Sequence, residues 1–124
     1  MMICVYGISH CGSVKKARKL LEEKNIQHSF IDFKTTPPTE AQVTRWLRCV
    51  KGGIINKSSA TWRGLTPQEK QQADNPQQVV QLILKYPLLI KRPLIEWGES
   101  DDNLSVGFDE NRLNLRIEQL FQAA

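Results

Sequence analysis

The chain has 124 residues, 40% of them hydrophobic and 24% charged, with a formal net charge of +4. This size and balance are typical of one soluble globular domain. No apolar run approaches the ~18 residues of a membrane span, and residues 1–7 lack the pattern of a signal peptide, so we expect a cytoplasmic protein that binds no membrane. The positive balance mildly favours anionic ligands. The basic residues are scattered and not interleaved with aromatic ones, which argues against nucleic-acid binding.

The first third of the chain predicts a strand–helix–strand unit. Residues 2–6 form a short apolar run, typical of a strand buried on both faces of a parallel sheet. Residues 13–24 repeat apolar side chains at helical spacing, and Asn25 is a plausible stop. Residues 28–33 form a second strand-like run. Such a unit places its two strands in parallel with a right-handed crossover.

The middle of the chain, residues 39–86, is predicted to be mostly helical, in three or four pieces. Capping-box patterns begin at Thr39, Thr66 and Asn75, and each indicates the start of a helix. The last of these helices should end before Pro87, because proline cannot continue a helix.

Strands return near the end of the chain. Residues 94–97 and 104–108 are predicted to form a hairpin across a turn at 98–103. Asp109 is a suitable N-cap for a final helix with an apolar face. The order predicts one α/β domain, with a mixed four-stranded sheet and a helical insertion at about residues 39–86.

Three cysteines, Cys4, Cys11 and Cys49, are present, with no CxxC pair and only two histidines. A structural metal site is therefore not expected, and free thiols are the ordinary state in a reducing compartment. Cys4 is interpreted as a core residue and Cys49 as a half-buried residue near a helix end. Either could pair with Cys11 only if the two Cα atoms came within about 7 Å.

Cys11 is the most informative residue, because it lies in the loop just before the first predicted helix. The unpaired amides at a helix start, here from Gly12 and Ser13 onward, stabilise an anion. A thiolate, the nucleophilic form of cysteine, is such an anion. Lys15 lies one turn further on the same face and adds positive charge. The alternative is that Cys11 is only a small loop residue, since most free cysteines are inert.

Two further segments are candidate parts of a site. The Arg92–Pro93 bond precedes a predicted strand. Local sequence favours the trans form, because only about 5–6% of such bonds are cis in folded proteins. In the cis form, the backbone here would be presented to an extended thiol peptide, and Arg92 would act as an anion clamp. Arg63 is a third candidate cation, with a solvated loop arginine as the alternative.

Taken together, these segments resemble the ArsC/Spx family, a thioredoxin-like group of glutaredoxin-coupled arsenate reductases, Spx-type regulators and YffB-like reductases. The resemblance covers nearly the whole chain and is carried by residues 6–17, 62–65, 87–95 and 106–108. It implies a thioredoxin-like sheet with an inserted helical segment. It also implies a reactive cysteine at Cys11, anion-binding arginines at Arg63 and Arg92, and a cis proline at Pro93.

Three positions depart from the family patterns. Arsenate reductases of this type have an arginine where this chain has Lys15 and a histidine where it has Gly7. Spx proteins usually have a second cysteine where this chain has Val14. The segment around Cys11 is most similar to the YffB-like branch.

The resemblance and the cysteine pattern together predict a glutathione-dependent thiol oxidoreductase with a single nucleophilic cysteine. The expected partners are glutathione as co-substrate, glutaredoxin as a candidate protein partner, and a small oxyanion or a disulfide as substrate. No bound cofactor and a monomeric state are expected. Two alternatives stay open: an arsenate reductase coupled to glutathione or glutaredoxin, and a non-catalytic Spx-like regulator that binds RNA polymerase.

Overall fold

The computed structural model describes residues 2–98, 100 and 103–122. It contains the strands β1 (Cys4–Gly7), β2 (Ser29–Asp32), β3 (Leu94–Glu96) and β4 (Leu104–Val106). The helices are α1 (Gly12–Glu23), α2 (Glu40–Cys49), α3 (Ala60–Arg63), α4 (Pro67–Gln72), α5 (Val79–Lys85), α6 (Glu110–Gln122) and the 3-10 turn η1 (Pro87–Leu89). Three residues of the predicted turn at 98–103, namely 99, 101 and 102, lie outside the described residues. In the described part of the chain, no helix is long and apolar enough to cross a membrane.

The four strands form one mixed sheet in the order β2-β1-β3-β4. β1 pairs in parallel with β2, and β3 pairs antiparallel with both β1 and β4. The strand–helix–strand unit, the hairpin and the α/β architecture predicted from the sequence are therefore confirmed. β1 is central, so the loop that follows it starts in the middle of the sheet.

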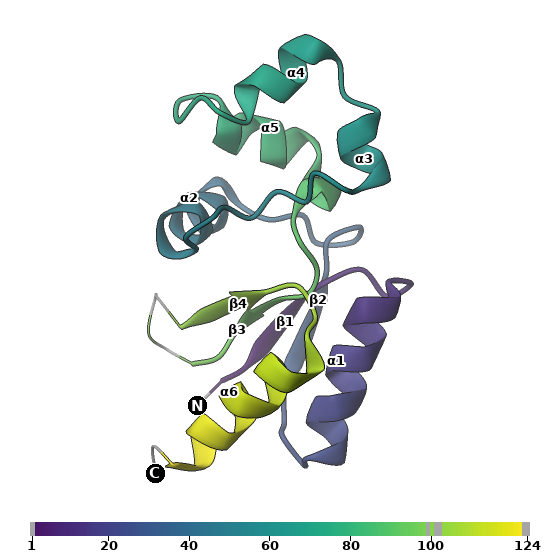
Figure 1. Cartoon of the computed structure of the whole chain (residues 1–124), viewed down its shortest axis with the longest axis vertical. Helices are drawn as coiled ribbons and strands as arrows, with labels where there is room; N and C mark the ends of the chain where they lie inside the picture. Colours follow the sequence, from purple (N-terminus) through teal and green to yellow (C-terminus); the bar gives the residue numbers. More distant parts are fainter. Residues whose placement is uncertain (1, 99, 101–102, 123–124) are drawn as a thin grey trace.

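Helices cover both faces of the sheet (Figure 1). On one face, α1 and α6 pack over a core cluster that includes Val5, Leu21, Ile95 and Ile117. On the other face, α2 and α5 pack over a second cluster around Trp46. The alternation of side chains along each strand supplies both clusters, because successive residues point to opposite faces. This explains why β1 is apolar at nearly every position.

The predicted helical insertion contains four helices, α2 to α5, as the sequence indicates. The capping boxes at Thr39 and Thr66 are both present, each with its two reciprocal hydrogen bonds. The one predicted at Asn75 is wrong. Its side chain accepts a hydrogen bond from the Gln77 amide at 2.8 Å, which makes a turn, and α5 begins only after Gln78, which provides no side-chain cap.

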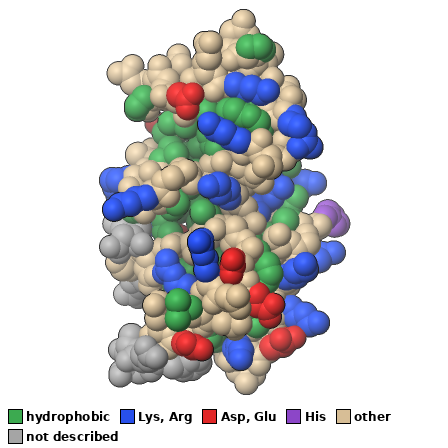
Figure 2. Space-filling model, viewed as in Figure 1, with side chains coloured by type: hydrophobic (Ala, Val, Ile, Leu, Met, Phe, Trp, Pro, Cys, Tyr) green, Lys and Arg blue, Asp and Glu red, His purple; other side chains and the backbone are tan. Residues whose placement is uncertain are grey.

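Helix ends elsewhere follow the sequence signals. Asn25 adopts a left-handed backbone with φ 57° just after α1, a conformation that asparagine tolerates better than most residues. The carboxylate of Asp109 accepts a hydrogen bond from the Arg112 amide at 3.0 Å at the start of α6. Lys and Arg side chains are distributed over the face shown in Figure 2 and do not gather into one patch.

Candidate active site

Cys11 lies between the end of β1 and the start of α1, in the N-cap position of that helix. Its backbone is extended, with φ −76° and ψ 124°. Its amide donates to the carbonyl oxygen of Ile8 at 3.2 Å, and its own carbonyl oxygen accepts from the Lys15 amide at 3.0 Å. The side chain is half-buried and packs against the core cluster under α1. The residue is thus fixed by its backbone and still partly open to solvent.

In the first turn of α1, no side-chain group of the described residues competes for the amides. Cys11 makes no side-chain capping hydrogen bond, and the turn contains no acidic residue. Among the described residues, the amides of Gly12, Ser13 and Val14 donate no backbone hydrogen bond. Unpaired amides and the helix dipole favour a negative charge at this end. Lys15 is exposed and follows directly, so the local charge is positive.

Gly7 and Val14 approach each other closely where β1 gives way to the loop. A Cβ placed on Gly7 would lie 2.5 Å from Cγ2 of Val14, which is 1% exposed. Two of the departures from the family patterns are therefore neighbours in space. The larger valine occupies the position of the second Spx cysteine and leaves room only for glycine at position 7.

The Arg92–Pro93 peptide bond is cis. The resemblance implied this geometry, and the local preference for trans is overruled by the tertiary structure. Pro93 is buried, and its carbonyl oxygen accepts from the Gly107 amide at 2.9 Å, which extends the β3–β4 hairpin. Because Tyr6 pairs with Leu94 in antiparallel register, Pro93 is opposite Gly7, at the sheet end from which the Cys11 loop leaves.

Arg92 is half-buried, and its Nη1 donates to the carbonyl oxygen of Leu88 at 3.1 Å. Among the described residues, its own amide and carbonyl make no main-chain hydrogen bond. Arg63 is exposed at the end of α3, and its Nη1 donates to the carbonyl oxygen of Ser58 at 2.6 Å. Of the predicted site residues, Cys11, Gly12, Ser13 and Lys15 thus form one contiguous group, and Pro93 lies at the same end of the sheet. Neither arginine makes a hydrogen bond or ion pair with that group in the described residues.

The other two cysteines belong to the opposite face of the sheet. Cys4 and Cys49 are half-buried and pack against the cluster under α2, whereas Cys11 packs against the cluster under α1. Cys4 begins β1, whereas Cys11 comes after the end of that strand. Because a strand rises ~3.3 Å per residue, the two cysteines lie towards opposite ends of β1. Burial raises the pKa of the Cys4 thiol, against the opposing hydrogen bond of Tyr6. Cys4 therefore packs against the core, as the sequence indicates, and its raised pKa favours the protonated thiol.

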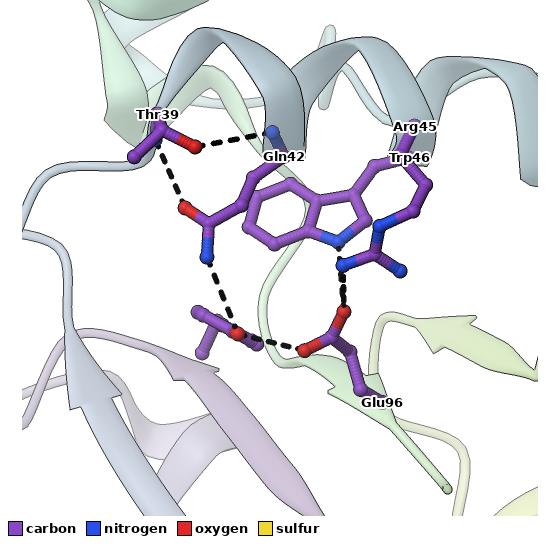
Figure 3. Close-up of polar contacts among 6 residues, drawn as sticks. Thr39, Gln42, Arg45, Trp46 and Glu96 are labelled. Carbon is purple, nitrogen blue, oxygen red and sulfur yellow. Dashed lines mark hydrogen bonds and ion pairs between the residues drawn. The ribbon is translucent and has the colours of Figure 1, made fainter. Parts of the chain in front are cut away.

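A polar network joins the sheet to α2 on that same face (Figure 3). Glu96 of β3 accepts hydrogen bonds from the hydroxyl of Tyr6 at 2.7 Å and from the indole of Trp46 at 3.3 Å. Arg45 forms an ion pair with the same carboxylate. Burial alone would raise the pKa of Glu96, but these three donors outweigh it and hold the pKa below its usual range.

Asp32 is a residue of the site region that the sequence did not indicate. It ends β2, pairs in register with Gly7, and its carboxylate accepts hydrogen bonds from the backbone amides of Lys34 and Ser9. An aspartate at a strand end followed by a polar turn is a recognisable signal for the bond to Lys34. The bond to Ser9 spans 23 residues and has no local signal.

Comparison with known proteins places this arrangement in a family. The sequence profile of the ArsC family matches residues 6–115. An uncharacterized protein of Haemophilus influenzae is 36% identical over 115 residues, covering 88% of this chain and 93% of that protein. The global transcriptional regulator Spx of Listeria innocua is 30% identical over 117 residues, covering 90% and 84% of the two chains.

A solved structure gives the same result for the fold. The YFFB (PA3664) protein superposes with a TM-score of 0.79 at 30% identity, covering 92% of this chain and 97% of that one. The mixed sheet with its inserted helices is therefore that of a known thioredoxin-like architecture. With a profile match over most of its length and a relative that is 36% identical, the chain belongs to the ArsC family.

Proposed function

We propose that the protein is a thiol oxidoreductase that uses Cys11 as its nucleophile and passes through a mixed disulfide with glutathione. One observation carries the proposal: Cys11 is a half-buried thiol at a helix start whose first-turn amides are unpaired among the described residues, with no acid in that turn. Such an environment favours the thiolate, the form that attacks disulfide sulfur. Membership of the ArsC family, which includes arsenate reductases, supports thiol chemistry at this position.

The reaction we propose has two exchange steps. The Cys11 thiolate attacks the glutathione sulfur of a mixed disulfide between glutathione and another thiol. A new sulfur–sulfur bond forms to Cys11, the old one breaks, and the other thiol leaves as a thiolate. A second glutathione thiolate then attacks the bound glutathione sulfur. Cys11 is released as a thiolate and glutathione disulfide is the product, so the electrons balance.

Val14 supports the use of an external thiol. A resolving cysteine at this position would allow an internal disulfide, but Val14 is apolar and buried. Cys4 and Cys49 pack on the other face of the sheet. Glutathione, which carries two carboxylates, suits the cations proposed for the site, Lys15, Arg63 and Arg92, because charge-assisted hydrogen bonds hold carboxylates well. The main chain at Arg92 is the proposed place for strand-like pairing with the bound thiol peptide.

Incubation with glutathione disulfide tests the proposal. Intact mass followed by peptide mapping should find one glutathionyl group, adding roughly 305 Da, on Cys11. The Cys11→Ser variant should take up none, and Cys4→Ser should behave like the unmodified protein. An adduct on Cys4 or Cys49 in place of Cys11 would contradict the assignment.

The rate of alkylation provides a second readout of the same property. The rate of iodoacetamide reaction at Cys11 at pH 7 should exceed that of an ordinary free thiol, such as glutathione, measured in the same buffer. A rate equal to or below that of the free thiol would remove the physical basis of the proposal.

Arsenate reduction is the second candidate, favoured by the family match. Here the Cys11 thiol would displace water from arsenate and form a sulfur–arsenic bond. Glutathione would then attack the Cys11 sulfur, the electron pair of the broken sulfur–arsenic bond would reduce arsenic(V) to arsenite, and a Cys11–glutathione disulfide would remain for glutaredoxin to reduce. Lys15 and Gly7 depart from the pattern of such enzymes. Arsenite formation with glutathione and glutaredoxin, lost in Cys11→Ser, would select this candidate.

A regulator that binds RNA polymerase is the third candidate, favoured by the 30% identity to an Spx protein. Recovery of polymerase in stoichiometric amount by the tagged protein, unchanged in Cys11→Ser, would select it over both enzymes.

A further inference from the structure

The Asp32 carboxylate connects two separate segments of the chain. Its Oδ1 accepts the Lys34 amide at 2.8 Å, within the turn that follows β2. Its Oδ2 accepts the Ser9 amide at 3.1 Å, from the loop that leads to Cys11. Each oxygen therefore has its own main-chain donor, one from the segment after β1 and one from the turn after β2.

The loop before Cys11 has few other fixed points. The Gly7 carbonyl oxygen accepts the Phe33 amide at 2.8 Å where β1 ends, and the Ile8 carbonyl oxygen accepts the Cys11 amide at 3.2 Å. Between these two bonds, Ser9 and His10 are both exposed and add no packing against the core. Among the described residues, the Ser9–Asp32 bond is thus the hydrogen bond that ties the exposed part of the loop to the sheet.

The carboxylate is suited to this role because it is ionised at neutral pH. Hydrogen bonds from the Lys34 amide, and then from Ser9, hold the pKa of Asp32 below its usual range. A charged acceptor forms a stronger bond to an amide than a neutral one. The turn itself is reinforced by Thr35, whose hydroxyl donates to the Asp32 carbonyl oxygen at 3.2 Å.

We propose that Asp32 is a positioning residue for Cys11: by holding the Ser9 amide, its carboxylate keeps the loop in the conformation that places the sulfur at the start of α1. The inference rests on the proposed role of Cys11 as nucleophile. Asp32 acts through the backbone, and the reaction uses no proton from it. A small displacement of a reacting group is enough to lower its reactivity.

The Asp32→Asn variant separates the two functions of the carboxylate. Asparagine has one acceptor oxygen, which serves the Lys34 amide in the same turn, while its NH2 group faces the Ser9 amide and cannot accept from it. We expect the iodoacetamide rate at Cys11 to fall about 3- to 10-fold at pH 7. At high pH, where the thiol is fully ionised, the rates of variant and unmodified protein should converge. A general loss of stability would not produce that convergence.

Thr35→Ala is the matched control, because it removes a bond of the same exposed turn and leaves Ser9 held. It should react like the unmodified protein. Equal rates for Asp32→Asn and the unmodified protein would overturn the inference, as would an equal slowing in Thr35→Ala. If the unmodified protein reacts as an ordinary free thiol, the proposed function fails whatever Asp32→Asn does. If it is activated and Asp32→Asn matches it, only this inference fails.

A measurement on the unmodified protein does not depend on whether the variants fold. In amide NMR spectra recorded against pH, the Ser9 and Lys34 resonances should shift together, with one midpoint below about 3.9, the ordinary value for aspartate. If the Lys34 amide resonance shifts with this midpoint and the Ser9 amide resonance does not, the inference is overturned.

Discussion

At the scale of single residues, Gly7 shows how closely the end of β1 packs against the first turn of α1. Its backbone is outside the left-handed region, so an alanine is allowed by conformation, and the obstacle is Val14 alone. The 2.5 Å approach leaves no space for a Cβ. The wall of the site is therefore built by a close contact between the end of β1 and the first turn of α1.

We expect Gly7→Ala to lower the free energy of unfolding by about 1–3 kcal/mol, the usual cost of overpacking a core. In a Val14→Ala background the same change should cost clearly less, because the methyl group that it meets is gone. Urea denaturation of the four proteins of this cycle measures the coupling. Equal costs in both backgrounds would show that Val14 is not the obstacle.

At the scale of elements, α2 is the helix whose start is best defined. Thr39 accepts the Gln42 amide at 3.1 Å, and Gln42 accepts the Thr39 amide at 2.9 Å. The helix then buries Val43 and Trp46 completely. The Thr66 box of α4 has the same geometry, but α4 buries no residue. The two capping boxes thus have the same pair of hydrogen bonds, but only α2 buries side chains in the core.

Thr39→Ala should lower the free energy of unfolding by about 1 kcal/mol, the typical value of an N-cap. Thr66→Ala should lower it by less than half as much, since fraying of α4 exposes little apolar surface. Thermal or urea denaturation of both variants checks the difference. A loss at Thr66 equal to that at Thr39 would show that α4 is part of the cooperative core.

These elements also show what the sequence could and could not predict. Strands, capped helices and the parallel unit depend on local patterns, and they are confirmed. The box at Asn75 failed because an asparagine can satisfy a turn amide two residues on just as well as a helix start. The cis bond at Pro93 is implied only by the family resemblance. The bond from Asp32 to Ser9 and the contacts of Glu96 join residues that are 23 to 90 positions apart. A single sequence carries no local signal for such contacts. The roles of Cys11, Lys15, Arg63 and Arg92 stay predictions.

At the scale of the whole molecule, Glu96 connects the helical insertion to the sheet. Its carboxylate accepts hydrogen bonds from Tyr6 of β1 and from Arg45 and Trp46 of α2, and each donor is 50 or more residues away in the sequence. Burial, followed by the hydrogen bond to Glu96, raises the pKa of Tyr6, so the phenol stays protonated and remains a donor. The network therefore depends on one ionised carboxylate.

Because the pKa of Glu96 is lowered in the folded protein, its ionised form contributes stability above the ordinary value of about 4.3. That contribution is lost as the pH falls through the lower folded value. We expect Glu96→Gln to lower the free energy of unfolding by about 1–3 kcal/mol at pH 7, the cost of weakening a charged hydrogen-bond network.

The loss should shrink steadily below about pH 4, because the unmodified protein then protonates the same group and forfeits the same bonds. Urea midpoints of both proteins between pH 7 and pH 3 measure this. The exposed Glu22, changed to Gln, is the control, and it should shift the stability by less than about 0.5 kcal/mol at every pH. If the loss of free energy of unfolding in Glu96→Gln stays constant with pH, then the shape of the Glu96 side chain, and not its charge, holds the insertion against the sheet.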